Sequence, residues 1–166
     1  MRAGIALGSN LGDRLANLSS ARHELTNLLE TRPPVLASSI YETDPVGCER
    51  GAPAFLNAVI EIRYAGDADD LLKQLRRIEA ALGRPVAHAR NTSRTLDLDL
   101  LYFGDVTIER AELQLPHPRM HERRFVLEPL CDIRPELVLP QQTETVAALL
   151  ARLPATPPLL RIHSEW

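Results

Sequence analysis

One ten-residue stretch with a strict two-residue period constrains the fold of this chain more than any other feature. Residues 54–63 read Ala-Phe-Leu-Asn-Ala-Val-Ile-Glu-Ile-Arg. Alternate side chains of a strand point to opposite faces of a sheet. One face therefore carries Leu56, Ala58, Ile60 and Ile62, and the other carries Phe55, Asn57, Val59 and Glu61. The segment is predicted to be a strand with an entirely apolar face.

Strands and helices are predicted to alternate along the rest of the chain. Leucines at helical spacing predict a helix at 13–30 that stops before Pro33-Pro34, and Asp67 is a candidate N-cap for a second helix that ends at Gly83. The predicted strands lie at 2–8, 35–42, 54–63 and 96–103. This βαββαβ order predicts an α+β fold with a ferredoxin-like sandwich core.

The C-terminal part of the sequence extends this core. It predicts Pro-rich turns, then an extra helix at 143–153 that begins at Thr143, and an extra strand at 159–162.

Length and composition fit one globular domain, which we predict to span 1–166. The 166 residues are 45% hydrophobic and 25% charged, and the net charge of -3 argues against nucleic acid as a partner. Cys48 and Cys131 lie far apart and form no CxxC pair, so a reducing compartment is favoured. No apolar run is long enough for a signal peptide or a membrane span, and we predict a cytoplasmic protein without a membrane partner.

Asp97 and Asp99 are separated by one leucine in the predicted strand at 96–103, so both carboxylates leave the same face. Two like charges at such positions repel each other, and a bound cation would remove the repulsion. Mg²⁺ prefers oxygen ligands and is commonly held by one or two carboxylates together with substrate phosphates. A solvated polar face of an edge strand explains the pair equally well.

Arginines just before this strand favour the metal interpretation. Arg84, Arg90 and Arg94 fall in the predicted loop that leads to Asp97. A polyphosphate substrate requires cations beside the metal, because charge on the transferring group must be met from several sides. The segment therefore predicts magnesium-dependent phosphoryl transfer. The alternative is that Arg94 merely pairs with one of the aspartates.

The segment Gly8-Ser-Asn-Leu-Gly12 joins a predicted strand to a predicted helix, as phosphate-binding loops do. It lacks the Gly-Lys-Ser/Thr ending of a P-loop, so its glycines are assigned to the tight turn.

Several short motifs occur in a characteristic order and together resemble the 6-hydroxymethyl-7,8-dihydropterin pyrophosphokinases, enzymes of folate biosynthesis. The resemblance covers Gly4 to about Pro140. The motifs are Gly8-Ser-Asn-Leu-Gly-Asp-Arg14, Tyr41-Glu-Thr-Asp-Pro-Val-Gly47, Phe55-Leu-Asn-Ala58, Arg77-Ile-Glu79, Leu82-Gly-Arg84, Arg94-Thr-Leu-Asp-Leu-Asp99, Leu115-Pro-His-Pro-Arg-Met120, Phe125-Val-Leu-Glu-Pro-Leu130 and Asp132-Ile-Arg-Pro-Glu-Leu137.

The resemblance implies an enzyme that moves the β,γ-pyrophosphoryl group of ATP to the hydroxymethyl oxygen of the pterin and releases AMP. It implies that Asp97 and Asp99 bind two Mg²⁺ ions, and that Arg84 and Arg94 grip the phosphates. Its substrates are small molecules, and we expect a monomer.

For the pterin, the resemblance implies a ring stacked between Phe55 and Phe125, with hydrogen bonds from Asn57 and from the segment that contains Thr43, Asp44 and Val46. Asn10 is expected nearby. From the residues alone, a core phenylalanine and a turn-forming asparagine remain the ordinary alternatives.

For the nucleotide, the resemblance implies a set of mostly polar contacts. These are Arg76, Glu79, Arg84, Arg94, Leu100, Leu113, His117 and Arg123. Two alternatives stay open: Glu79 can form a helix-surface pair with Arg76, and His117 can make a structural hydrogen bond.

The segment Arg90-Asn-Thr-Ser-Arg94 departs from the family, which often has Trp-Gly-Pro ahead of the arginine. Arg76 stands where the family sometimes has Gln, and Pro118 where a Tyr can follow the His. The altered loop at 91–93 leaves open a paralogue that acts on a different hydroxymethyl heterocycle. A separate hypothesis is a non-catalytic binding module on a ferredoxin-like sheet, including an RNA-binding one, although the net negative charge argues against RNA.

Overall fold

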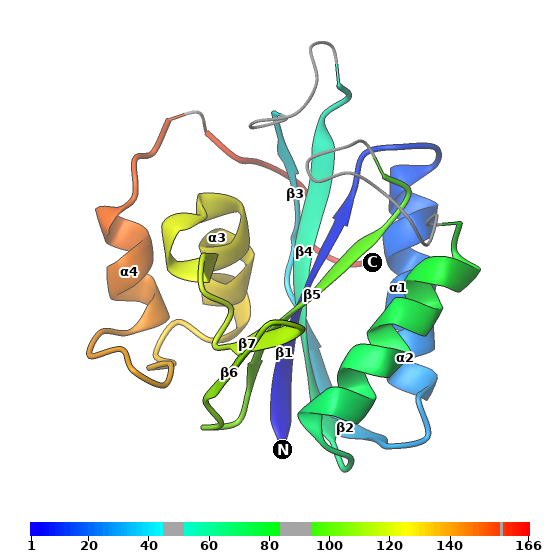
Figure 1. Cartoon of the computed structure of the whole chain (residues 1–166). Coiled ribbons are helices and arrows are strands. Elements are labelled where there is room, and N and C mark those ends of the chain that lie inside the picture. Colours follow the sequence, from blue (N-terminus) through cyan, green and yellow to red (C-terminus); the bar gives the residue numbers. More distant parts are fainter. Residues whose placement is uncertain (45–51, 84–93, 157) are drawn as a thin grey trace.

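The centre of this protein is an antiparallel sheet with helices on both of its faces (Figure 1). The computed structural model describes residues 1–44, 52–83, 94–156 and 158–166. Its sheet has the strand order β5-β1-β4-β3-β8, and β2 also pairs with β4. The strands are β1 (Arg2–Ser9), β2 (Thr31–Ala37), β3 (Ile40–Thr43), β4 (Phe55–Tyr64), β5 (Asp97–Phe103) and β8 (Leu160–His163).

Helices lie on both sides of the sheet. One face carries α1 (Arg14–Asn27) and α2 (Ala68–Ala81), and the other carries α3 (Arg124–Ile133), with α4 (Val146–Arg152) packed beside α3 (Figure 1). A small hairpin, β6 (Ile108–Arg110) and β7 (Leu113–Leu115), and a 3-10 turn at Met120–Glu122 connect β5 to α3. Within the described residues, no helix is both long and apolar enough to cross a membrane.

The alternating pattern of β4 gives the sheet a separate core on each side. Leu56, Ala58, Ile60 and Ile62 pack in the main apolar cluster with the leucines of α1 and α2. Val59 packs on the opposite face, in a second cluster with residues of α3 and α4. The predicted division of β4 into two faces is confirmed, and so is the ferredoxin-like α+β core.

Three predicted elements need correction. The strand expected at 35–42 is two strands, β2 and β3, separated at Ser38-Ser39, and Pro33-Pro34 lies inside β2. The extra helix is shorter than predicted, because the hydroxyl of Thr145, not Thr143, caps it by accepting the Ala148 N–H at 3.2 Å. The region expected to contain Pro-rich turns also holds the β6–β7 hairpin and α3.

Helix α3 was missed because its sequence signals are weak. Pro129 lies inside it, and a proline in a helix interior removes one backbone hydrogen bond. No side chain caps its N-terminus. Its apolar stripe, which includes Val126, Leu127 and Leu130, supplies the stabilisation instead by packing on the sheet.

A buried carboxylate fixes α3 to the sheet. Glu61 on β4 is only 4% exposed. It accepts a 2.6 Å hydrogen bond from the Tyr102 hydroxyl, and the guanidinium of Arg134, at the end of α3, donates to both of its oxygens. A second carboxylate, Asp132, accepts the Tyr41 hydroxyl at 2.9 Å and the Ser39 N–H at 3.1 Å.

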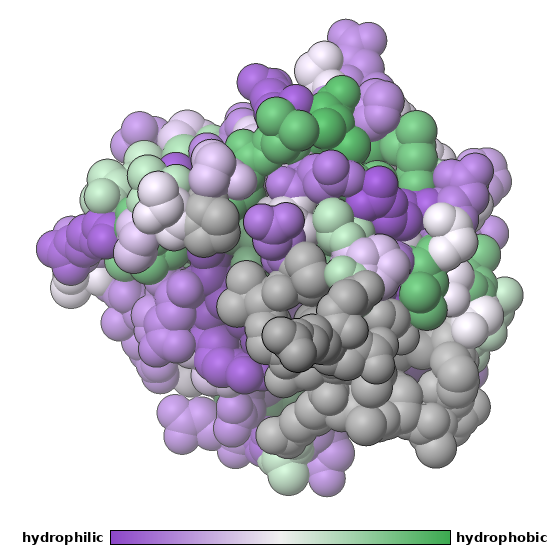
Figure 2. All heavy atoms as spheres, turned by 90° about the horizontal axis from the view of Figure 1, so that it is seen from above, coloured by the Kyte–Doolittle hydropathy of each residue, from purple (hydrophilic) through white to green (hydrophobic). Residues whose placement is uncertain are grey.

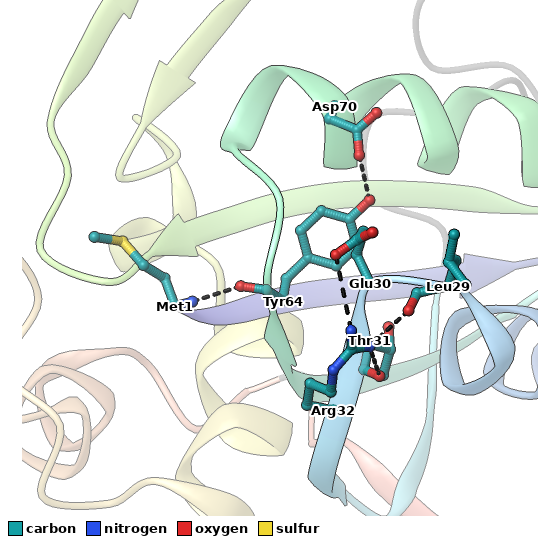
Figure 3. Close-up of polar contacts among 7 residues, drawn as sticks. All are labelled: Met1, Leu29, Glu30, Thr31, Arg32, Tyr64 and Asp70. Carbon is teal, nitrogen blue, oxygen red and sulfur yellow. Dashed lines mark hydrogen bonds and ion pairs between the residues drawn. The ribbon is translucent and has the colours of Figure 1, made fainter.

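Polar contacts surround the chain start, at the end of the sheet where β1 begins and β4 ends (Figure 3). The Met1 amine donates to the Tyr64 carbonyl, and the Tyr64 hydroxyl donates to Asp70 of α2. Arg32 lies beside Glu30 and donates to the carbonyls of Leu29 and Thr31. The Tyr64 bonds tie the chain start and α2 to the end of β4, whereas the Arg32 contacts are local to the start of β2. All of them lie far from the ends of the strands that carry the predicted site.

Arg134→Ala tests the role of the buried carboxylate. Removing the cation leaves Glu61 buried beside Tyr102 without its charged partner, and we expect a loss of about 3–5 kcal/mol in the free energy of unfolding, measured by urea denaturation. Arg110→Ala is the matched control, because the Arg110–Asp69 pair is exposed. The role of Glu61 as the anchor of α3 is contradicted if both variants unfold at the same urea concentration.

Candidate functional site

The two predicted metal ligands lie on the α3 side of the sheet. Leu98 and Leu100 point into the main cluster on the α1–α2 side, which leaves Asp97 and Asp99 on the opposite face. In the sheet register Asp97 pairs with Gly8 and Asp99 pairs with Ala6. The prediction that the two carboxylates share one face is confirmed.

Gly8 lies where the predicted metal and pterin residues meet. It pairs with Asp97 on one side and with Asn57 on the other. A Cβ added at Gly8 would lie 3.7 Å from Asn57 Oδ1, 3.9 Å from Asp97 Cβ and 4.0 Å from Phe55 Cδ1. These are ordinary contact distances, so the three side chains surround Gly8, and we refer to this position as the floor at Gly8.

The amide of Asn57 is oriented by its neighbour on β3. Asn57 is buried, and its Nδ2 donates to the Thr43 hydroxyl at 2.8 Å. This bond directs the amide oxygen toward the floor at Gly8. Asp44 follows β3 directly and is exposed. Two other predicted site residues, Val46 and Arg84, lie outside the described residues.

Arg94 forms an ion pair with the first aspartate. Its Nη1 lies 2.7 Å from Asp97 Oδ2, and both side chains are partly exposed. The pairing anticipated as an alternative to phosphate binding is therefore present. In the described part of the chain, no third His, Cys, Asp or Glu joins Asp97 and Asp99 in a metal-binding group. Two carboxylates suffice for Mg²⁺, which commonly keeps water and phosphate oxygens as its other ligands.

His117 lies close to the same charges. Its backbone N–H donates to the Leu101 carbonyl at 2.8 Å, which anchors it beside β5. Burial, followed by the neighbouring cations Arg123 and Arg119, lowers the pKa of His117 to about 4, while Asp97 opposes the shift. The imidazole is therefore neutral at physiological pH. Its Nδ1 accepts the Arg119 N–H at 3.2 Å, so the structural hydrogen bond considered as an alternative is present.

Arg123 completes a group of cations around the aspartates. Burial and the nearby Arg119 lower its pKa, whereas Asp99 and Asp97 act in the opposite direction. Its guanidinium carbon lies 5.6 Å from the centre of the Phe125 ring. Phe125 is in the first turn of α3 and packs partly against the second cluster, so it belongs to the same side of the sheet as Phe55.

Four predicted nucleotide contacts lie elsewhere in the fold. Leu100 and Leu113 are buried in the main cluster, on the opposite side of the sheet from the aspartates. Arg76 is exposed on α2. Glu79, also on α2, is only 6% exposed and accepts the Leu98 N–H at 2.8 Å. Glu79 is therefore buried, and the alternative that it forms a helix-surface pair with Arg76 is wrong. A role of these four residues in binding ATP stays a prediction.

Arg119 is a candidate that sequence reasoning left out. It lies next to His117 and acts electrostatically on both His117 and Arg123. A signal was present, because Arg119 belongs to the Pro-His-Pro-Arg-Met motif.

The described ends of β1, β4 and β5 meet at the upper end of the sheet in Figure 1, and Figure 2 looks onto that end. Hydrophilic residues occupy much of this surface, and hydrophobic residues gather along one side of it (Figure 2). An antiparallel sheet with paired carboxylates, arginines and a neutral histidine at one end has the chemistry of an enzyme that acts on phosphorylated substrates.

A family model described as 7,8-dihydro-6-hydroxymethylpterin-pyrophosphokinase matches residues 4–135. The chain therefore belongs to the 7,8-dihydro-6-hydroxymethylpterin-pyrophosphokinase family.

Individual relatives agree with this assignment. The chain is 46% identical to the 2-amino-4-hydroxy-6-hydroxymethyldihydropteridine pyrophosphokinase of Bacillus subtilis over 132 residues, which are 78% of this chain and 75% of the relative. It is 41% identical to the protein of the same name from Haemophilus influenzae, with 82% and 83% covered. A solved HPPK-DHPS structure from Plasmodium falciparum has a TM-score of 0.71 at 15% identity and supports the fold alone. The match covers 91% of this chain and 44% of that one.

The low pKa of His117 predicts a pH-dependent stability. An unfolded chain binds the proton at a pKa of about 6.5, so between pH 6.5 and 4 the unfolded state holds more protons than the folded state. The contribution of a neutral His117 is thus complete above pH 6.5 and is lost as the pH falls to 4. A histidine-ring NMR titration of the protein without ligands should show His117 titrating near pH 4.

His117→Asn should weaken this part of the pH dependence of unfolding, and His121→Asn, which replaces a more exposed histidine, is the control. Titration of the His117 ring near pH 6.5 would show that its surroundings do not disfavour the protonated imidazole.

Proposed function

We propose that this protein transfers the pyrophosphoryl group of ATP to the hydroxymethyl group of 6-hydroxymethyl-7,8-dihydropterin, giving AMP and the pterin diphosphate, in folate biosynthesis. Family membership and the printed names of its relatives support the reaction. The observation that carries it onto this chain is the floor at Gly8, around which Asp97, Asn57 and Phe55 converge.

Asp97 and Asp99 would hold the Mg²⁺ ions, two by the family resemblance. Bound there, Mg²⁺ would neutralise charge on the triphosphate and polarise its phosphoryl oxygens. Arg94 and Arg123 supply fixed cations on the same side of the sheet. With the phosphates bound, Arg94 can exchange its carboxylate partner for phosphate oxygens, since its planar fork suits both.

The pterin would lie over Gly8 with its edge toward the Asn57 amide. Because the Asn57 Nδ2 donates to Thr43, the amide oxygen is directed at Gly8, where it can accept a hydrogen bond from a ring N–H or an amino group of the pterin. Phe55 and Phe125 would contact the faces of the ring. This placement would bring the hydroxymethyl group near the phosphates held at Asp97. Pyrophosphoryl transfer then depends mainly on positioning and electrostatics.

The same set of features weighs against the remaining hypotheses. A non-catalytic module has no need for paired aspartates beside arginines, and the relatives are named as pyrophosphokinases. An assay with ATP and a panel of hydroxymethyl heterocycles separates the pterin enzyme from a paralogue of altered specificity.

A single domain, a monomeric state and a cytoplasmic location stay predictions from the sequence.

Asp97→Asn and Asp99→Asn test the metal ligands. Each replacement keeps the size of the side chain and removes one negative charge that Mg²⁺ needs, and we expect kcat for AMP formation to fall about 100-fold or more. The free energy of unfolding should change little, because both side chains are partly exposed. Asp105→Asn, at an exposed position beyond β5, is the control. Wild-type turnover in both variants would refute the role of the aspartates.

Phe55→Leu tests the pterin face. Loss of the flat ring removes stacking and contact area, and we expect the KM for the pterin to rise about tenfold while the KM for ATP is unchanged. Phe55→Tyr keeps the ring and should remain close to the wild type. An unchanged pterin KM in the leucine variant would mean that Phe55 is an ordinary packing residue.

A further inference from the structure

The segment that contains β8 crosses the sheet from the side of α4 to the side of α1, and we refer to residues 158–166 as the β8 segment (Figure 1). β8 is antiparallel to β3, so that Leu160 lies opposite Glu42 and His163 lies opposite Ile40. The segment therefore begins beside the end of β3 that leads to the proposed pterin residues. It then runs back along β3 toward the start of that strand.

The side chains of β8 bury little surface. All four residues are exposed, and the exposed fractions of Leu160 and Ile162 are 61% and 36%. Arg161 makes one polar contact, in which its Nε donates to the Ser39 hydroxyl at 2.7 Å. Ordering a chain segment costs conformational entropy, and contacts have to offset that cost. Because β8 offers mainly backbone hydrogen bonds, the segment needs an anchor elsewhere.

Trp166 is this anchor. Its Nε1 donates to the Ser38 carbonyl at 2.7 Å, its ring packs against the main apolar cluster, and the guanidinium carbon of Arg22 on α1 lies 5.3 Å from the ring centre. Ser38 is itself held by Val59, because its N–H donates to the Val59 carbonyl and its hydroxyl accepts the Val59 N–H, both at 2.9 Å. Trp166 is therefore fastened to the central strand β4 through a residue that is 1% exposed.

The strand that the β8 segment supports carries one of the proposed pterin contacts. β3 has four residues and lies between β4 and β8, and three residue pairs join it to β4. Its last residue, Thr43, accepts the Asn57 Nδ2 at 2.8 Å. Side-chain contacts also hold Tyr41 and Glu42, but they do not replace backbone pairing along the outer edge of β3. Strand ends open locally at a low cost in free energy, so the position of Thr43 depends on the pairing of the residues before it.

We propose that Trp166 is a positioning residue for the pterin half of the proposed site. By fastening the β8 segment along β3, it keeps that strand paired up to Glu42, and Thr43 stays in place to accept the Asn57 Nδ2. The Asn57 amide oxygen consequently stays directed at Gly8, where the edge of the pterin is placed. This inference rests on the proposed function.

Trp166→Ala tests the anchor. It removes the indole N–H and the packed ring, and we expect the KM for 6-hydroxymethyl-7,8-dihydropterin to rise about fivefold, as for the loss of one hydrogen bond. The kcat and the KM for ATP should keep their wild-type values, because Asp97 and Asp99 lie on β5 at the opposite edge of the sheet. Arg161→Ala removes the bond to Ser39 and should raise the same KM.

Thr43→Val shows whether Trp166 acts through the proposed contact. Valine keeps the shape of threonine but cannot accept the Asn57 Nδ2, so this variant should raise the pterin KM by itself. Two residues that act through one interaction do not have additive effects. Adding Trp166→Ala to Thr43→Val should therefore produce no further rise. A merely structural role of Trp166 would instead give the product of the two separate changes.

Tyr64→Phe is the matched control, because it removes a hydrogen bond to Asp70 at the end of β4 that lies away from the site. It should lower the free energy of unfolding and leave the pterin KM unchanged.

The outcomes are distinct. The inference is overturned by a wild-type pterin KM in both Trp166→Ala and Arg161→Ala, by an equal rise in the KM for ATP, by multiplicative effects with Thr43→Val, or by the same rise in Tyr64→Phe. Each of these results leaves the proposed function intact. Absence of pyrophosphoryl transfer by the wild type would instead refute the proposed function.

Discussion

The burial of Glu61 decides where the second helical layer lies. A carboxylate in the interior of a sheet is tolerated only when its charge and its lone pairs are satisfied, and here Tyr102 and Arg134 satisfy them from β5 and from the end of α3. This requirement holds α3 against β4 at its C-terminal end. At the start of the same helix, Arg123 lies close enough to Asp99 and Asp97 for both carboxylates to act on its pKa, and Phe125 follows in the first turn. A structural ion pair at one end of a ten-residue helix thus sets the position of proposed ligand-binding groups at the other.

Opposite charges balance one another at the site. Asp97 pairs with Arg94, and the electrostatic field of both aspartates acts on Arg123. Burial, followed by the neighbouring Arg123 and Arg119, lowers the pKa of His117 and keeps it neutral, so its ring can accept or donate a hydrogen bond without adding a further charge. A polyphosphate with its metal ions would bring both signs of charge and could replace these internal pairs. In the proposed reaction these residues would exchange charged partners, and no new charge would have to form.

Sequence reasoning was reliable where apolar residues repeat at a regular spacing and form a packed face. The alternation in β4 and the leucines around Asp97 and Asp99 predicted which side of the sheet each residue faces, because a one-residue shift would expose the whole apolar set. It failed for α3, where Pro129 weakens the helical signal and tertiary packing compensates. It also offered Glu79 a helix-surface pair with Arg76 as an alternative, whereas Glu79 is buried and accepts the backbone N–H of Leu98 on an edge strand. Backbone donors leave no trace in residue identity, so such partners cannot be read from a sequence.

The backbone contacts of the turn after β1 could not be read from the sequence either. This turn lies between a strand and a helix, as phosphate-binding loops do. Phosphate loops direct their backbone N–H groups at the ligand. Here the Asn10 N–H is taken by the Arg94 carbonyl, and the Ser9 hydroxyl and Arg14 guanidinium are directed at the carbonyls of other segments. The turn therefore organises the strands that hold the proposed substrates, and phosphate charge has to be met by side chains such as Arg94 and Arg123. Because the turn after β1 does not present its backbone N–H groups to phosphate, the chain lacks a P-loop signature and has arginines near the aspartates instead.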